Sequence, residues 1–482
     1  MGKRQRRIRA RGTSGPVAGA ATEKHGLAAH RANGLPNLRS PKEPLVPERP
    51  NLRPGPDTPV SDPQAESSWQ ERRRPDYDAT VDRYLVVARQ HRVRDSPPPD
   101  SVHPLGERLK GIPGFSIDKV AAAAGSDPEM LRMENLDTDI PPPAAAVEAT
   151  RAAVGTDEAN SWLPFTGMSE LKLEVARMIV RRGGPQYDPE SEVVITSGEG
   201  DNMLDALLAL TDPGDEVIVP DPTYAGMLQR VRLAGDVPRL VPLHPTEHGW
   251  RWDLDALEAA VSDRTRAIFF GNPSFPSGWV LNDEEWAAVQ RICTERQIRL
   301  LYWSAMEAIV FGGRKVVVPA ALEGMRDLTV TLGGVACEQR MIGWRIGWIV
   351  ASETDTPQLG MVHIYNGLVA SGFNQLGAIA ALRADDHAAW VAEWERRHDA
   401  TMEQLAGLPA IPAHGGWSLL LDAEAGTTAP DLSAALLEHK VAATPMTAWG
   451  ETVAPRHVRF VYSNEPVERL AALGERVRAA LS

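Results

Sequence analysis

The sequence predicts an α/β protein whose parallel sheet lies in the middle of the chain. From about residue 106, segments with helical spacing of apolar residues alternate with short β-branched runs, which is typical of βα units around a parallel sheet. At 482 residues and 43% hydrophobic, the chain is long enough to bury more than one core. The last hundred residues mix helices and strands, which indicates a second, smaller α+β domain.

Several helices and strands can be placed from their patterns. Apolar residues recur at helical spacing over 169–182, so a helix is expected there with Ser169 as its N-cap. The β-branched run 193–196 is followed by the turn Ser197–Gly200 and by a helix over 202–210. That order of strand, glycine turn and helix directs backbone N–H groups towards an anion. Other elements are expected as strands at 216–219, 267–270, 299–303, 328–332, 417–421 and 457–462, and as a helix at 387–405.

The charge and the cysteine content narrow the classes of partner. A formal net charge of -13 argues against nucleic acid or an anionic membrane as a partner, because both need clustered positive charge. No stretch of about 18 apolar residues occurs, so no membrane span is expected. The two cysteines, Cys293 and Cys337, lie in unrelated contexts and predict no disulfide framework, which fits a cytoplasmic location. A small molecule or a protein is the expected partner, and no metal site is expected.

Residues 1–105 differ in composition from the rest of the chain. They are rich in Pro, Arg, Asp and Ser, including the run Ser96–Asp100, and are expected to form a disordered tail. The basic opening Gly2–Arg7 could contact nucleic acid. A solvated tail, or a start site assigned too far upstream, is the preferred interpretation.

Five motifs follow one another between about residues 112 and 482. They are Trp162-x4-Gly167-x3-Leu171, then Asp212–Val217 leading to Pro220–Tyr224, then Asn272–Gly278, Gly343–Trp348 and Val458–Phe460. In this order and spacing they resemble the class I/II aminotransferases, the aspartate-aminotransferase-like group of fold type I. The alternative is a chance collection of Gly and Pro turns on another doubly wound sheet.

The resemblance implies an architecture and a cofactor. It implies homodimers with the active site at the subunit interface, and a large domain that carries pyridoxal phosphate on a mostly parallel, seven-stranded sheet. On this chain the large domain would span 161–360. The small domain would combine 106–160, which includes an N-terminal arm, with 361–482.

The resemblance also implies a site, in which the contacts to the cofactor ring are replaced. In the family a lysine forms the Schiff base, an acid pairs with the pyridine nitrogen, and Asn and Tyr bind the ring hydroxyl. The lysine position, six before Gly343, is Cys337, whose thiol cannot form that bond. The acid position is Trp303, whose indole is only a donor. The tyrosine and asparagine positions are Met306 and Phe275, so every polar contact to the ring is missing.

At the phosphate end of the site, one position matches the family and two positions differ from it. Arg345, eight positions after Cys337, matches the family's phosphate-binding arginine, whereas the expected serine is Gly334. The turn that wraps the phosphate carries Glu199 where the family has a small residue. A carboxylate beside a dianion is repulsive, so Glu199 is expected to pair with Arg345 and to close the site from within. No cofactor is therefore predicted.

Three further positions correspond to substrate and ring contacts of the family. Arg459 matches the arginine that binds the substrate α-carboxylate, Tyr224 matches the aromatic residue that stacks on the ring, and Trp162 replaces a tyrosine from the neighbouring subunit. Plainer interpretations exist: the arginines fit ordinary salt bridges, and Cys337 fits an inert buried thiol. The large side chains fit a cavity that was filled after the cofactor was lost, namely Tyr224, Trp162, Phe275, Trp303 and Met306.

These residues leave three functions open. The first is an enzyme that works without pyridoxal phosphate and holds an amino acid or related carboxylate against Arg459 and the aromatic residues. The second is a non-catalytic protein that uses the fold for binding or dimerisation, which a filled pocket favours. The third is an unusual pyridoxal-phosphate-dependent aminotransferase, which the family alone suggests and which must explain four replaced residues.

Overall fold

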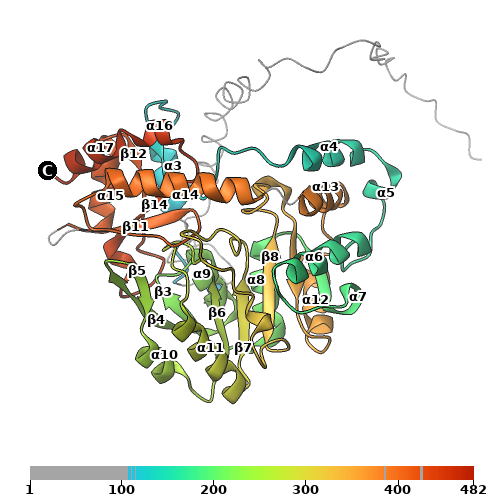
Figure 1. Cartoon of the computed structure of the whole chain (residues 1–482). Helices are drawn as coiled ribbons and strands as arrows, with labels where there is room; N and C mark the ends of the chain where they lie inside the picture. The colour runs from blue at the N-terminus through green and yellow to red at the C-terminus, as the bar shows by residue number, and fades with distance from the viewer. Residues whose placement is uncertain (1–106, 110, 114–115, 385–386, 424–426) are drawn as a thin grey trace, which may run out of the picture. The chain divides into compact units, whose positions relative to one another are not determined.

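The computed structural model describes residues 107–482, apart from 110, 114–115, 385–386 and 424–426. The tail expected over 1–105, with its basic opening, lies outside the described residues. Figure 1 shows the strands of a large sheet side by side, with helices packed against them. Helices α6, α8 and α12 contact the part of the sheet formed by β2, β8 and β9, and α9 and α10 contact β4.

The large sheet has eight strands, so the expected mostly parallel sheet is confirmed with one strand more than expected. Five adjacent strands, from β8 to β4, run parallel to one another, whereas β9 is antiparallel to both β2 and β8. The additional strand, β5, forms a hairpin with β4. In spatial order the strands are β2 (Val193–Thr196), β9 (Gly347–Val350), β8 (Thr329–Gly334), β7 (Arg299–Trp303), β6 (Thr265–Gly271), β3 (Glu216–Asp221), β4 (Val237–Thr246) and β5 (Gly249–Trp252).

Burial explains the composition of the central strands. Every residue of the parallel strands β3 and β8 is buried, because helices cover both faces of a parallel sheet and leave no solvent-facing side. A continuous β-branched and apolar run is the sequence pattern of such a strand. The strands expected at 193–196 and 299–303 are found with those bounds.

Two of the predicted helices differ slightly at their starts. Ser169 is the first residue of α6, and the N-cap is Met168, whose side chain makes no capping bond. Helix α8 begins at Glu199, directly after Gly198 with φ 114, so the glycine turn is shorter than expected. The α-helices are α3 (Ser116–Ala124), α4 (Ala144–Ala153), α5 (Asp157–Asn160), α6 (Ser169–Arg181), α7 (Pro189–Glu192), α8 (Glu199–Leu210), α9 (Ala225–Ala234), α10 (Leu254–Ala260), α11 (Asp283–Arg296), α12 (Thr356–Asn366), α13 (Gly372–Ala384), α14 (His387–Gln404), α15 (Ala429–Glu438), α16 (Val467–Leu470) and α17 (Leu473–Ala480).

Short 3-10 turns complete the helical elements. They are η2 (Glu107–Leu109), η3 (Pro319–Ala321), η4 (Ile342–Trp344) and η5 (Ala454–Arg456). Among the described residues, no helix combines the length and the apolar character that crossing a lipid bilayer would require.

A small antiparallel sheet lies in the C-terminal part of the chain. Its order is β10 (Ala410–Ile411), β11 (Ser418–Asp422), β14 (His457–Val461) and β13 (Thr444–Pro445). Near it, β1 (Leu131–Arg132) pairs in parallel with β12 (Val441–Ala442), so an N-terminal segment lies beside the C-terminal hundred residues. The expected smaller α+β unit is therefore present.

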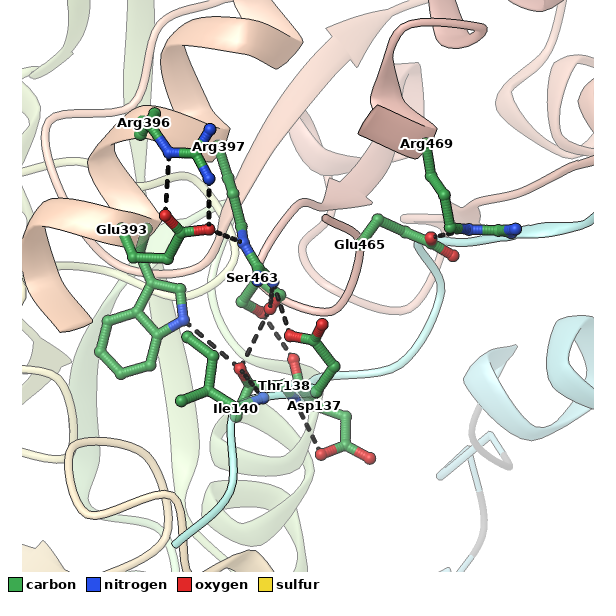
Figure 2. Close-up of polar contacts among 11 residues, drawn as sticks. Asp137, Thr138, Ile140, Glu393, Arg396, Arg397, Ser463, Glu465 and Arg469 are labelled. Atoms are coloured by element: carbon green, nitrogen blue, oxygen red, sulfur yellow. Dashed lines mark hydrogen bonds and ion pairs between the residues drawn. The ribbon is translucent and has the colours of Figure 1, made fainter. Parts of the chain in front are cut away.

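Arg397 of α14 links three segments that are distant in sequence (Figure 2). Its Nη1 donates to the Asp139 carboxylate at 2.7 Å and to the Ser463 carbonyl at 2.6 Å, and its Nε donates to Glu393 at 2.8 Å. Arg397 is 4% exposed. Its neighbour Arg396 binds the same Glu393 carboxylate, but 56% of the Arg396 side chain is exposed.

Replacing Arg397 should therefore destabilise the protein far more than replacing Arg396. We expect Arg397→Ala to lower the free energy of unfolding by about 3 kcal/mol, because it removes a nearly buried guanidinium together with all of the charge-assisted hydrogen bonds by which it links the three segments. Arg396→Ala, the matched control, should cost less than about 1 kcal/mol, as exposed ion pairs do. Urea denaturation followed by circular dichroism measures both. Equal losses for the two variants would contradict this description of the Arg397 contacts.

Candidate active site

The candidate residues gather where the parallel strands end. Trp303 is the last residue of β7, Tyr224 and Phe275 follow β3 and β6, and Cys337 follows β8. The carboxyl ends of parallel strands meet at one edge of a sheet, which is where ligands bind in such folds. The fold therefore brings these four residues into one region.

Two aromatic rings stack against each other in this region. The ring centroids of Tyr224 and Trp303 are 5.5 Å apart, and their planes differ by 23°. Phe275 contacts both rings, with centroid distances of 5.6 Å to Tyr224 and 6.5 Å to Trp303. A Cβ atom at Gly271 would lie 3.0 Å from the Trp303 ring, so a glycine on the neighbouring strand makes room for the indole. Direct side-chain contact thus fills the space between these residues.

Glu199 is buried beside this stack. Its Oε2 accepts a hydrogen bond from the Trp303 indole at 3.4 Å, and its Oε1 has no partner. A Cβ atom at Gly334 would lie only 2.5 Å from Oε1, so the carboxylate occupies the space that a larger residue at 334 would need. Burial raises the pKa of Glu199 to about 7, against the opposing effects of Arg345 and of the indole hydrogen bond.

Arg345 does not pair directly with Glu199, which differs from the expectation. Arg345 is exposed, and its Nη1 donates to the Ile342 carbonyl at 3.1 Å. Its backbone is left-handed at φ 53, and its guanidinium lies 2.7 Å from where a Cβ of Gly198 would be. Arg345 therefore acts on Glu199 only through its charge.

Cys337 and Met306 are buried near the stack. Burial raises the pKa of the Cys337 thiol well above its usual value, and the negative charges of Glu199 and Glu338 raise it further. A thiol with a raised pKa stays protonated and is a poor nucleophile. Met306 is 3% exposed, and its Sδ lies 3.5 Å from where a Cβ of Gly416 would be.

Arg459 of β14 is completely buried. Its Nη2 donates to the Glu134 carbonyl and, at 3.3 Å, to the Thr444 hydroxyl, whereas its Nε and Nη1 have no partner. The guanidinium lies 4.8 Å from the centroid of Phe275 and 4.7 Å from that of Trp449. Burial lowers the pKa of Arg459 to about 9, and the Glu134 charge opposes this shift.

Trp449 was not predicted as a site residue, although it contacts most of the group. Its ring lies 5.3 Å from Phe275 and 5.8 Å from Tyr224. The only sequence signal was an indole followed by Gly450, ten residues before Arg459. Trp162, by contrast, is 72% exposed and its ring contacts Phe165, so within this chain it lies outside the aromatic group.

Comparison with known proteins decides the family. Residues 131–477 match the family model described as aminotransferase class I and II. The chain belongs to this family. One curated relative of this aminotransferase-family chain is a probable aspartate/prephenate aminotransferase of Aquifex aeolicus. It is 30% identical over 335 residues, which are 67% of this chain and 84% of the relative.

Other relatives cover more of the chain. Aromatic-amino-acid aminotransferase 2 of Thermococcus litoralis is 27% identical over 387 residues, 78% of this chain and 98% of the relative. The solved structure of N-succinyldiaminopimelate aminotransferase from Mycobacterium tuberculosis matches with a TM-score of 0.71 at 28% identity, over 78% of this chain and 98% of that one. The class I/II aminotransferase fold expected from the sequence is therefore confirmed.

Glu199 should make the stability of this aminotransferase-family chain depend on pH. A carboxyl whose pKa rises from 4.5 to about 7 on folding binds its proton more tightly in the folded chain. Its contribution to stability is therefore lost as the pH rises through that range. We expect Glu199→Gln to remove a decline on the order of 3 kcal/mol in the free energy of unfolding across that range.

Urea denaturation at a series of pH values measures this difference. Burial also raises the pKa of Glu307 to about 7. Because Glu307 is present in both proteins, the difference between their two pH profiles reports on Glu199 alone. Parallel pH profiles for the wild type and the variant would show that Glu199 is not a buried, titrating carboxyl.

Proposed function

We propose that this chain is an aminotransferase-fold protein that does not use pyridoxal phosphate, and that it serves as a non-catalytic binding or dimerisation protein. The observation that carries the proposal is the stack of Trp303 on Tyr224. The family resemblance assigns the face of Tyr224 to the cofactor ring, and here an indole lies against Tyr224 instead.

The ring end of the site does not fit the cofactor. Trp303 and Phe275 are 5% and 3% exposed, and both contact Tyr224. A pyridine ring would have to displace an indole that is packed at interior density. The indole is also no substitute for an acid, because it cannot accept the proton of a pyridinium. Cys337 supplies no amine for a Schiff base.

The phosphate end does not fit either. The Glu199 carboxyl lies where Gly334 leaves room, at the start of α8, and a helix start is where an anion would bind. A second anion beside this carboxylate would be repelled whenever the carboxylate is charged. Both ends of the site thus favour the second of the three functions considered from the sequence.

Incubation with pyridoxal phosphate tests the proposal. After borohydride reduction and peptide mass mapping, we expect no pyridoxyl-lysine near the site, because Cys337 offers no amine. The absorbance spectrum should equal the sum of protein and free cofactor. A pyridoxyl group on Lys315, the nearest lysine upstream of Cys337, together with a new absorbance band, would overturn the proposal. Such a result would favour the unusual aminotransferase that the names of the relatives suggest.

A second candidate is an enzyme that binds an amino acid or related carboxylate without pyridoxal phosphate. The two unpartnered nitrogen atoms of Arg459 favour it, because a buried guanidinium gains from an anion. Against it, Phe275 and Trp449 already cover the guanidinium. In a filled site the Arg459 guanidinium is a packing cation, that is, a structural charge stabilised by the faces of two aromatic rings and not by a bound ligand.

Arg459→Lys separates these two candidates. The lysine keeps the charge but loses the planar fork and the ring stacking. For a packing cation we expect the free energy of unfolding to fall by about 1 to 3 kcal/mol, with no change in binding of amino acids or dicarboxylates. Thermal denaturation and isothermal titration calorimetry measure the two quantities. Weakened ligand binding at unchanged stability would favour the carboxylate-binding enzyme.

The dimerisation role rests on exposed apolar side chains. Trp162 is 72% exposed, and Met361 and Tyr365 of α12 are 53% and 84% exposed. Burying such side chains against a second copy of the chain would remove their apolar surface from water. The family resemblance places Trp162 at a subunit interface, so we propose a homodimer that buries it.

A further inference from the structure

We infer that the segment 446–454 is a lid over Arg459, and that the carboxylate of Asp221 is the latch that holds this lid shut. The segment connects β13 with β14 of the small sheet and includes the first residue of η5, and it passes the end of β3, where Asp221 lies. The inference deepens the proposed function, on which it rests, because it names what keeps the filled site closed.

The latch consists of five hydrogen bonds to one carboxylate. Asp221 is completely buried, and its Oδ2 accepts from the backbone N–H groups of Glu451, Thr452 and Val453 at 3.0, 2.7 and 3.2 Å. The Thr452 hydroxyl also donates to Oδ2 at 2.9 Å, and the Ala454 N–H donates to Oδ1 at 2.9 Å. Successive backbone N–H groups around one anion form a nest, and bonds to an ionised acceptor are the stronger kind.

The lid itself is shaped to receive the carboxylate. A Cβ atom at Gly450 would lie 1.9 Å from Asp221 Oδ1, so only glycine lets the segment approach this closely. Three single contacts accompany the latch: the Thr223 N–H donates to the Trp449 carbonyl at 2.8 Å, Gln229 Nε2 donates to the Ala448 carbonyl at 3.4 Å, and Arg232 pairs with the exposed Glu451 at 2.8 Å. None of them replaces the five bonds to Asp221.

The lid closes the site through Trp449. Trp449 is 1% exposed, and its ring covers one face of the Arg459 guanidinium, 4.7 Å from it. The same ring contacts Tyr224 and Phe275. Because Trp449 lies directly before the latched residues, the segment cannot move away from Arg459 while Asp221 holds it. Release of the latch would expose a guanidinium that now has two unpartnered nitrogen atoms.

Asp221→Asn tests the latch by changing the side chain that accepts all five hydrogen bonds. Asparagine keeps the size of the side chain but has one neutral acceptor oxygen, so the NH2 group should replace the acceptor of the Ala454 N–H and the four bonds at the Oδ2 position should lose the negative charge that strengthens them. Hydrogen–deuterium exchange of the full chain should show amides 446–454 exchanging about tenfold faster or more, with little change elsewhere. Phenylglyoxal should then modify Arg459, which peptide mass mapping detects and which burial prevents in the wild type.

Glu216→Gln is the matched control. Glu216 lies at the other end of the same strand, is also completely buried, and accepts hydrogen bonds from Ser262, Arg239 and Arg264. Its replacement should leave exchange of 446–454 unchanged. Thr452→Val, which removes one of the five bonds, should accelerate exchange of the same segment by a smaller factor and tests the latch even if the Asp221 variant fails to fold.

The inference is overturned if Asp221→Asn and Thr452→Val leave exchange of 446–454 at the wild-type rate. It is equally overturned if Glu216→Gln accelerates that segment as much as Asp221→Asn does, because the effect would then be a general loss of stability. These measurements use no cofactor or substrate. Binding of pyridoxal phosphate would therefore overturn the proposed function without changing the outcome for the lid.

Discussion

The contact between the Trp303 indole and the Tyr224 ring is the interaction on which the rest of the site depends. Protein interiors are packed as densely as organic crystals, and an emptied polar pocket is costly unless side chains fill it. Large side chains need space, and here glycines provide it. Gly271 makes room for Trp303, and Gly334 makes room for Glu199. These large side chains and the glycines beside them therefore form one packed set.

Titratable groups inside this set are shifted towards their neutral forms. Burial raises the pKa values of Glu199 and Cys337 and lowers that of Arg459. A site that binds a charged cofactor uses fixed charges of opposite sign to do so. Here the Glu199 carboxyl lies at the start of α8, and the fully buried Arg459 is covered by two aromatic rings. Both features suit a closed interior better than an open binding site.

The sequence predicted the elements whose signals are local. Strands β2 and β7 are continuous apolar runs, and the motifs from Trp162 to Phe460 were sufficient for the family. Strands β4, β5 and β9 were not placed from the sequence, and β5 pairs with β4 through a turn without a strong hairpin signal. Contacts between distant segments were also beyond prediction. The Glu199 to Trp303 hydrogen bond joins residues 104 positions apart, and the bonds from the lid to Asp221 span about 230.

The prediction that Glu199 pairs with Arg345 was wrong for a related reason. Their charges and the motif spacing are visible in the sequence, but the left-handed backbone at Arg345 is not. Arg345 is exposed, and the side-chain hydrogen bond that Glu199 accepts comes from the Trp303 indole. The opposite charges of the two residues were therefore not sufficient to predict a direct ion pair between them.

The most direct test of a filled site is a crystal structure of the full-length protein grown with a saturating concentration of pyridoxal phosphate. The electron density should show Trp303 stacked on Tyr224 and the Glu199 carboxylate beside Gly334, with no ligand density between the two rings. A pyridine ring lying against Tyr224, with Trp303 displaced and a phosphate at the start of α8, would contradict the filled site.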